Sequence, residues 1–315
     1  MATTLAAASE RSKRSDLKRR WLRQETFEGY FFAGPAILGF MIFVLGPLLA
    51  SLFFSFTEYK IISAPRWVGL GNYITAFTDD QLFWTSLNVT MTYTVIAVPL
   101  NLALGFLVAV LMNQKIKGIT LYRIVWYMPA IVPAVANAVL WQWVFNADFG
   151  LLNLLLWNLF HIQGPRWLIA SNTGIPALII MSVWGMGSGM LIYLGGLQGI
   201  PQHLYEAVEI DGGSWWASFR HVTIPMMTPV IFFNLITGLI GTFQVFTPAY
   251  VMTQGGPGYA TYFYVLHLYK NAFQYLRMGY ASALAWILML ITLVGTWILF
   301  RSSSWVYYEG MEANR

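Results

Sequence analysis

The sequence predicts an all-α membrane protein with about six transmembrane helices. Hydrophobic residues make up 57% of its 315 positions and charged residues only 10%, whereas soluble domains carry about 25% charged residues. The apolar residues gather into long runs separated by polar segments. Because charged side chains and open backbone go unsatisfied in hydrocarbon, those polar segments mark where the chain leaves the membrane.

The apolar runs are each long enough for the ~20 residues that a helix needs to cross a bilayer. We expect spans over 30–57, 84–112, 121–146, 173–199, 225–252 and 279–300. These runs contain no Asp, Glu or Lys, and their one arginine is Arg123, at a boundary. Several contain internal prolines, which would break soluble helices but are tolerated in membrane bundles.

The segment before the first span is polar and basic. Its cations are Arg11, Lys13, Arg14, Lys18, Arg19, Arg20 and Arg23. A nucleic-acid arm is one interpretation, but such a run beside a span is typical of a cytoplasmic anchor on membrane lipid, so no nucleic-acid partner is expected. The predicted organisation is a basic segment at 1–29, a transmembrane domain at 30–302 and a cytoplasmic tail at 303–315.

The distribution of lysine and arginine predicts the orientation. With the N-terminus inside, the outer segments hold Lys60, Arg66, Arg166, Lys270 and Arg277. The other thirteen of the 18 cations then fall in cytoplasmic segments. Because cytoplasmic loops are enriched in Lys and Arg, both termini and residues 200–224 are expected in the cytoplasm.

Residues 200–224 form the longest polar interruption in the C-terminal half. Pro201 opens the segment, Gly212-Gly213 interrupts it and Pro225 begins the next apolar run. This pattern predicts a short helix, a glycine turn and a second short helix, with Pro225 starting the fifth span.

This loop carries a family resemblance. The residues concerned are Glu206-Ala207, Asp211-Gly212, Phe219 and Ile224-Pro225. Their spacing resembles the "EAA…DGA…F…I.LP" loop of permease subunits of binding-protein-dependent ABC importers, most closely the maltose-type carbohydrate-uptake class. Val208 and Gly213 depart from that pattern by small-to-medium replacements. The stretches 69–73, 253–258 and 279–283 also resemble family motifs, so the resemblance covers roughly 30–300.

The resemblance implies one of two transmembrane subunits of a sugar importer in the cytoplasmic (inner) membrane. The implied partners are a second homologous permease, an extracytoplasmic solute-binding protein and a cytoplasmic ATPase dimer, which would hold ATP and Mg. Loop 200–224 would ride in a groove on the ATPase and rotate the adjoining helices when that groove closes on ATP. The implied coupling residues are Glu206, Ala207, Glu209, Asp211, Gly212, Phe219 and Pro225.

Physical roles can be given to three of these residues. Glu206 and Asp211 could make charge-assisted hydrogen bonds, although Asp211 could equally cap the second short helix. Gly212 would permit the sharp turn.

Motifs for chemistry within this chain are lacking. There is no Gly-x-x-x-x-Gly-Lys-Ser/Thr for ATP binding and no His-Glu-x-x-His or cysteine cluster for a metal. We therefore expect a transport subunit and not an enzyme, without metal or cofactor of its own. The uncharged spans favour a neutral solute driven by a partner ATPase, since ion-coupled carriers need a buried ionisable group. An importer of another neutral solute, a channel and a membrane-embedded enzyme remain as alternatives.

The resemblance also indicates where the solute would sit. Carried over by alignment, the family's contact positions fall at Ala130, Ala134, Ser182, Gly185, Met186, Gly238, Thr242 and Val245. On the same helix faces, hydroxyls of a sugar could be bound by Asn137, Ser182, Thr242 and Gln244, with Trp141 and Trp184 stacking on its C–H faces and Met186 alongside. The alternative is that the amides bond across helices and the tryptophans only pack.

Overall fold

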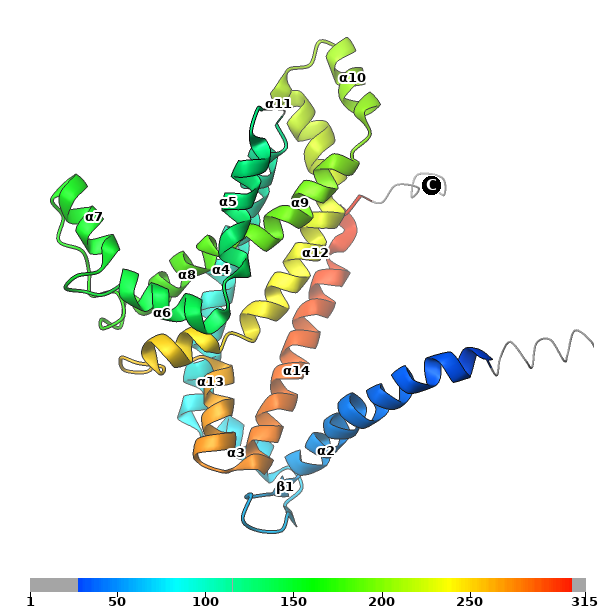
Figure 1. The fold of residues 1–315 in the computed structure, drawn as a ribbon. Coiled ribbons are helices and arrows are strands. Elements are labelled where there is room, and N and C mark those ends of the chain that lie inside the picture. The colour runs from blue at the N-terminus through cyan, green and yellow to red at the C-terminus, as the bar shows by residue number, and fades with distance from the viewer. Residues whose placement is uncertain (1–27, 115, 308–315) are drawn as a thin grey trace, which may run out of the picture.

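The computed structural model describes residues 28–114 and 116–307, and helices dominate it (Figure 1). Within those ranges the named strands are β1 (Thr57–Glu58) and β2 (Arg66–Trp67), a short antiparallel hairpin. Nearly all of the basic 1–29 segment and residues 308–315 of the tail lie outside the described residues. The predicted all-α class is confirmed.

Four helices in the described part of the chain are long and apolar enough to cross a membrane. They are Glu28–Ser55, which includes the π-helical turn η1 (Met41–Leu45) and α2 (Gly46–Ser55), then α4 (Gln81–Met112), Trp215–Phe243 and α14 (Met278–Arg301). Two bent pairs pass the same test: α5 (Ile119–Ile131) with α6 (Ala134–Val144), and α8 (Gly174–Trp184) with α9 (Gly187–Gly199). The predicted six spans are reached only if each bent pair counts as one.

The expected straight span at 121–146 is broken in the structure, because α5 and α6 meet at 99°. Val132 has extended backbone, with φ −65° and ψ 127°, and the next residue is Pro133. Proline disfavours the helical region for the residue before it. Tolerance of internal prolines therefore does not extend to this position, and α6 runs across the bundle instead of continuing α5 (Figure 1).

The pair α8 and α9 bends by 45° at Gly185–Met186. Directly after the bend, a Cβ on Gly187 would overlap the carbonyl oxygen of Trp126 in α5. Glycine is needed at this point because the α5 and α9 backbones approach so closely.

The fifth span is displaced toward the N-terminus from its predicted range of 225–252. One continuous helix runs from Trp215 to Phe243, comprising α11 (Trp215–Ser218), the π-helical turn η2 (Phe219–Thr223) and α12 (Ile224–Phe243). Pro225 lies in the first turn of α12 without starting a helix. The chain then forms η3 (Ala249–Thr253), α13 (Tyr264–Tyr269) and η4 (Lys270–Gln274) before α14.

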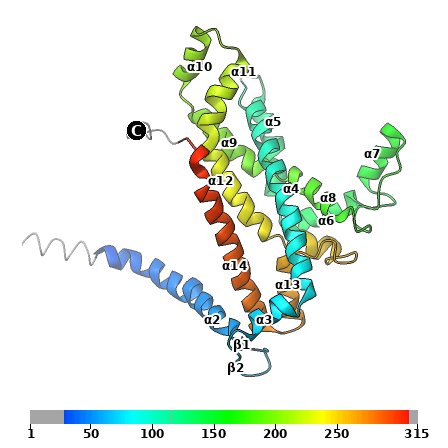
Figure 2. The ribbon, with the colours of Figure 1, turned by 180° about the vertical axis from the view of Figure 1, so that it is seen from behind.

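Shorter elements occupy the connections. The hairpin leads into α3 (Gly71–Thr78), α7 (Leu151–Phe160) projects from the body between α6 and α8, and η5 (Ser303–Trp305) follows α14 (Figures 1 and 2). The first helix diverges from the bundle and touches it mainly where α2 meets α14. In the most apolar 18-residue stretch of this helix, no residue is buried in the isolated chain.

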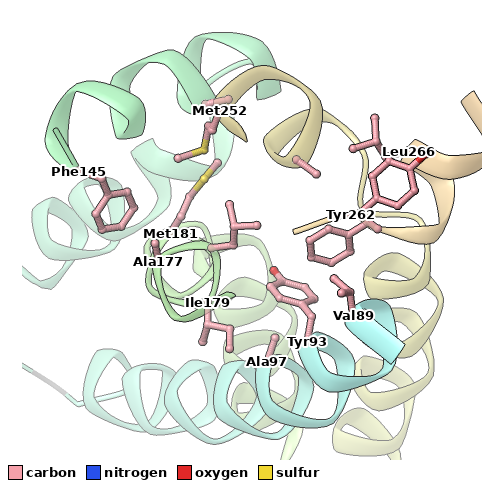
Figure 3. Close-up of a cluster of buried hydrophobic side chains, with 14 residues drawn as sticks. Val89, Tyr93, Ala97, Phe145, Ala177, Ile179, Met181, Met252, Tyr262 and Leu266 are labelled. Carbon is pink, nitrogen blue, oxygen red and sulfur yellow. The ribbon is translucent and has the colours of Figure 1, made fainter. Parts of the chain in front are cut away.

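Helix α4 forms the centre of the packing, against α8, α9 and α12. In one buried cluster, side chains of α4 meet those of α8 and of the 249–266 segment (Figure 3). A second cluster lies where α4 and α9 meet Val222 and Met227, beside the 200–224 loop. Core packing therefore connects the 200–224 loop directly to α4 and α9.

Candidate translocation site and coupling loop

The polar loop contains a well-formed short helix, α10 (Gln202–Ile210). The chain turns back after it because Gly212 has φ +75°, a left-handed conformation that glycine adopts without steric cost. The turn is closed by the amide of Gly213, which donates to the carbonyl oxygen of Val208 at 2.8 Å. The expected helix and glycine turn are both present, but the second helix is the start of the fifth span.

One face of α10 is fixed to the body. The Tyr205 hydroxyl lies 3.1 Å from Oγ1 of Thr223 in η2, and Leu204, Tyr205 and Val208 pack on the second core cluster. The opposite face presents Glu206, Ala207, Glu209 and Ile210 to the exterior. Asp211 and Gly212 are exposed at its end. A force on α10 would therefore pass through Tyr205 to the base of α12.

Aromatic rings support the other arm of the loop. The rings of Trp215 and Phe219 stack with centroids 5.3 Å apart and planes 9° apart. The Phe219 ring centroid also lies 6.1 Å from that of Phe106 in α4, while Pro225 is half-buried in the helix above. These two candidate coupling residues thus belong to the packing that joins the loop to the spans, and the other five lie on its exposed rim.

A cavity of about 510 Å³ lies between α4, α8, α9 and α12. Among the residues that the sequence places on the solute path, Ser182, Met186 and Thr242 line it, as do the aligned positions Gly185, Gly238 and Val245. None of its lining residues carries a formal charge. The geometry suits an uncharged ligand with hydrogen-bonding groups.

The other four candidates lie elsewhere. Trp141 packs on Trp184 with ring centroids 5.8 Å apart, outside the cavity lining. Asn137 Oδ1 and Trp141 Nε1 are both buried and lack a hydrogen-bond partner among the described residues. Gln244 is exposed just past the end of α12. The structure thus divides the predicted path residues into a group lining the cavity, a group on α6 and α8, and Gln244 alone.

Several cavity residues did not figure among the predicted sites. They are Tyr93 and Asn101 on α4, Ser188 and Tyr193 on α9, and Asn234 and Thr237 on α12. The amide of Asn101 donates to Ser182 Oγ at 2.9 Å, and the buried Tyr193 hydroxyl has no partner within the described ranges. Asparagine within an apolar span was a signal available in the sequence, since such groups are costly in lipid and face the bundle interior.

No group of three or more His, Cys, Asp or Glu side chains in the described ranges could hold a metal ion. The cavity and the loop are connected through α9 and α12, which line the cavity and flank the loop.

Comparison with known proteins agrees with this architecture. The family model for "Binding-protein-dependent transport system inner membrane component" matches residues 101–306. The chain is 43% identical over 299 residues to the probable ABC transporter permease protein YesP of Bacillus subtilis, covering 94% of this chain and 96% of the relative. It is 32% identical over 253 residues to the trehalose/maltose transport system permease protein MalF of Thermococcus litoralis, covering 80% and 84%.

A solved structure shares the fold. The crystal structure of a bacterial ABC transporter involved in the import of the acidic polysaccharide alginate superposes with a TM-score of 0.78 at 21% identity, covering 92% of this chain and 97% of that one. Taken with the family match and the relatives, this shows that the chain belongs to the family of inner membrane components of binding-protein-dependent transport systems.

Proposed function

We propose that this chain is one of two transmembrane subunits of an ABC importer that carries a neutral sugar or oligosaccharide. A relative named for trehalose and maltose transport, 32% identical to it, supports the substrate class. The observation that carries the proposal is the cavity of about 510 Å³, whose lining has hydroxyls, amides and aromatic rings but no charged group. An acidic polysaccharide would need cationic partners in such a site.

The power for transport would come from a separate ATPase dimer that binds at residues 200–224. Its docking surface on this chain would be the exposed rim of α10, with Glu206, Glu209 and Asp211 offering carboxylates and Ile210 an apolar contact. The Tyr205–Thr223 contact and the Phe219 stack would transmit movement of that rim to α12 and α4. This arrangement supports coupling because both contacts link the rim directly to packed helices.

A second permease subunit would complete the path. The most apolar 18-residue stretch of the first helix contains no buried residue, and the helix leaves the bundle at an angle (Figure 1). The cavity between α4, α8, α9 and α12 is also partly open in the isolated chain. A homologous subunit seated against these faces would enclose the solute.

Orientation is part of the proposal. The 113–118 connection and the 200–224 loop share one end of the molecule, where Asn113, Gln114, Trp215 and Phe219 line a common crevice. The hairpin and residue 277 meet at the other end. Placing the first end in the cytoplasm follows the lysine and arginine distribution and puts both termini inside.

The test is uptake by the complete transporter reconstituted in liposomes with internal ATP. Tritiated neutral di- to tetrasaccharides and uronic-acid oligosaccharides of the same length would be compared, each with the system's binding protein present. Saturable, ATP-dependent uptake of a neutral sugar is expected. Uptake confined to the uronic-acid series would refute the neutral-substrate proposal.

A further inference from the structure

A second cavity, of about 300 Å³, lies at the end of the molecule opposite the 200–224 loop. Three separate segments form its walls: the β1 region with Glu58, Tyr59 and Lys60, α3 with Asn72, and the start of α14 with Arg277 and Tyr280. It is remote from the central cavity, with which it has no lining residue in common. None of its lining residues is among the candidate coupling or solute-path residues.

The walls of this cavity are rigidly connected. Asn72 Nδ2 donates to the carbonyl oxygens of Ser55 and Thr57, at 2.8 and 2.9 Å. The amide of Gly279 donates to the carbonyl oxygen of Tyr59 at 3.1 Å, and Lys60 forms a β-bridge with Arg277. The site is therefore preorganised, which lowers the entropy cost of binding a partner.

Arg277 supplies a cation that is available for an external partner. Its guanidinium carbon lies 5.0 Å from the ring centroid of Tyr280, and its side chain is exposed. Among the described residues, an ion pair joins Lys60 to Glu58, and His267 lies 3.0 Å from the Asp80 carboxylate; neither contact includes Arg277. A guanidinium above an aromatic ring keeps N–H donors free for a carboxylate, which it can bind through two hydrogen bonds.

Exposed apolar side chains adjoin the cavity-lining residues in the sequence. Ile62 is 88% exposed and Trp67 is 63% exposed, and Leu70 lies exposed directly before α3; each is within two residues of a lining position, Lys60, Val68 or Gly71. Arginine and aromatic side chains surrounded by apolar groups are typical of the energetic centre of protein–protein interfaces. A protein surface fits these features better than a free small molecule, because the exposed apolar side chains lie outside the cavity lining.

We propose that this outer cavity docks the solute-binding protein of the transport system, with Arg277 binding an acidic side chain on that protein. The inference rests on the proposed function for its orientation, which places this end outside the membrane. The family depends on a binding protein, and the solved alginate transporter of the same fold was crystallised in complex with a periplasmic protein. Charge complementarity selects a carboxylate on the partner.

The test is association of the complete transporter, in lipid nanodiscs, with its purified solute-binding protein at ~50 and ~300 mM NaCl, on either side of physiological ionic strength. Arg277→Glu is expected to raise the Kd by roughly tenfold or more and to reduce its salt dependence. Arg166→Glu is the matched control: it makes the same charge change on the same predicted side, in a separate pocket beside α7, and should change the Kd by less than about twofold. Equal effects of the two variants would overturn the proposal.

A second measurement guards against misfolding of the Arg277 variant. A photo-crosslinking amino acid at Ile62, in an otherwise unchanged chain, should yield adducts with the binding protein that map to an acidic surface. Reversing an acid there to Arg should restore binding to Arg277→Glu. Adducts confined to the second permease or to lipid would contradict the assignment. Because these readouts do not require uptake, failure of the proposed sugar specificity would appear separately in the liposome assay.

Discussion

The phenolic oxygen of Tyr280 lies 2.6 Å from Oδ2 of Asp80, 200 residues away in sequence. The same carboxylate lies 3.0 Å from Nε2 of the buried His267, and its other oxygen accepts from the amides of Leu82 and Phe83 at the start of α4. One carboxylate therefore joins α4, α13 and α14. The Arg277 guanidinium also lies above the ring of Tyr280, so this junction forms part of the wall of the outer cavity.

Removing the Tyr280 hydroxyl should destabilise the end of the molecule opposite the 200–224 loop. A hydrogen bond to a charged group contributes about 1.5–3 kcal/mol, so Tyr280→Phe should lower the thermal unfolding temperature in detergent by a few degrees. Tyr122→Phe, at a position 57% exposed in the chain, serves as the control. Equal unfolding temperatures for Tyr280→Phe and wild type would show that the contact contributes nothing.

Acidification should loosen the same junction through His267. Burial lowers the pKa of His267 below its ordinary value of 6.5, as do Arg277 and Lys270, while the nearby Asp80 carboxylate raises it. The Tyr262 hydroxyl and the Asn271 amide also face the ring. Because the folded state favours the neutral ring, the stabilisation is present above pH ~6.5 and is lost as the pH falls through the lower folded pKa.

The measurement is the unfolding temperature between pH ~4.5 and ~8 for wild type and His267→Gln. The wild-type value should fall more steeply below pH ~6.5 than the value for the variant. Parallel curves would exclude His267 as the titrating group. Arg220 and His221 lie at the other end, so His221→Gln controls for histidine loss in general.

The close approach of α5 and α9 makes a third prediction. Gly187→Ala would place a methyl group against the Trp126 carbonyl oxygen, and overpacking of this kind costs about 1–3 kcal/mol. Gly195 is on the same helix, and a Cβ added there would meet nothing within 4 Å, so Gly195→Ala should leave stability unchanged or slightly higher. Similar unfolding temperatures for both variants would refute the close contact.

The coupling proposal makes a fourth prediction. Glu206→Lys should leave the transporter assembled but abolish uptake, because the charge on the exposed rim of α10 is reversed at the ATPase surface. Gly212→Val should do the same by straining the φ +75° turn, at a cost of about 1–3 kcal/mol. His203→Gln, also exposed on α10, is the control. Normal sugar uptake by Glu206→Lys at normal protein levels would remove that residue from the coupling surface.

The sequence was sufficient for the fold class and the polar loop because both depend on local composition. The apolar runs, the proline that opens the loop at 201 and the glycine that ends its first helix at 212 are visible in the sequence without tertiary information. The 99° break before Pro133 was not foreseen, since a proline in a membrane helix can either be accommodated or end it, and the packing of α6 decides which. The junction at Asp80 joins residues that only the assembled fold brings together.

For the solute path too, helical periodicity gave the position of some residues, whereas the position of others depends on the tertiary structure. Helical periodicity placed Ser182 and Met186 on one face, and both line the cavity. The same reasoning extended a straight helix through Trp141, but the bend at Pro133 carries that residue away from the lining. Asn101 was not among the predicted residues, although its amide donates to Ser182 directly.

The last prediction separates the cavity from the α6 group as the solute site. The buried hydroxyl of Tyr193 has no hydrogen-bond partner within the described ranges, and Tyr193 lines the cavity together with Asn234 and Ser182. Tyr193→Phe and Ser182→Ala should raise the KM for sugar uptake by roughly tenfold each if a solute hydroxyl meets these groups, since one hydrogen bond lost at a buried site costs about 1–3 kcal/mol.

Asn137→Ala and Trp141→Ala test the other location, where Asn137 Oδ1 and Trp141 Nε1, which lack a partner among the described residues, could receive the solute in another state of the transport cycle. The controls are Thr237→Ser, which keeps the hydroxyl in the cavity, and Trp143→Phe, at an exposed position of α6. A raised KM confined to the first pair assigns the solute to the cavity, and one confined to the second pair assigns it to α6. Unchanged KM in all four variants would show that none of these four side chains binds the solute.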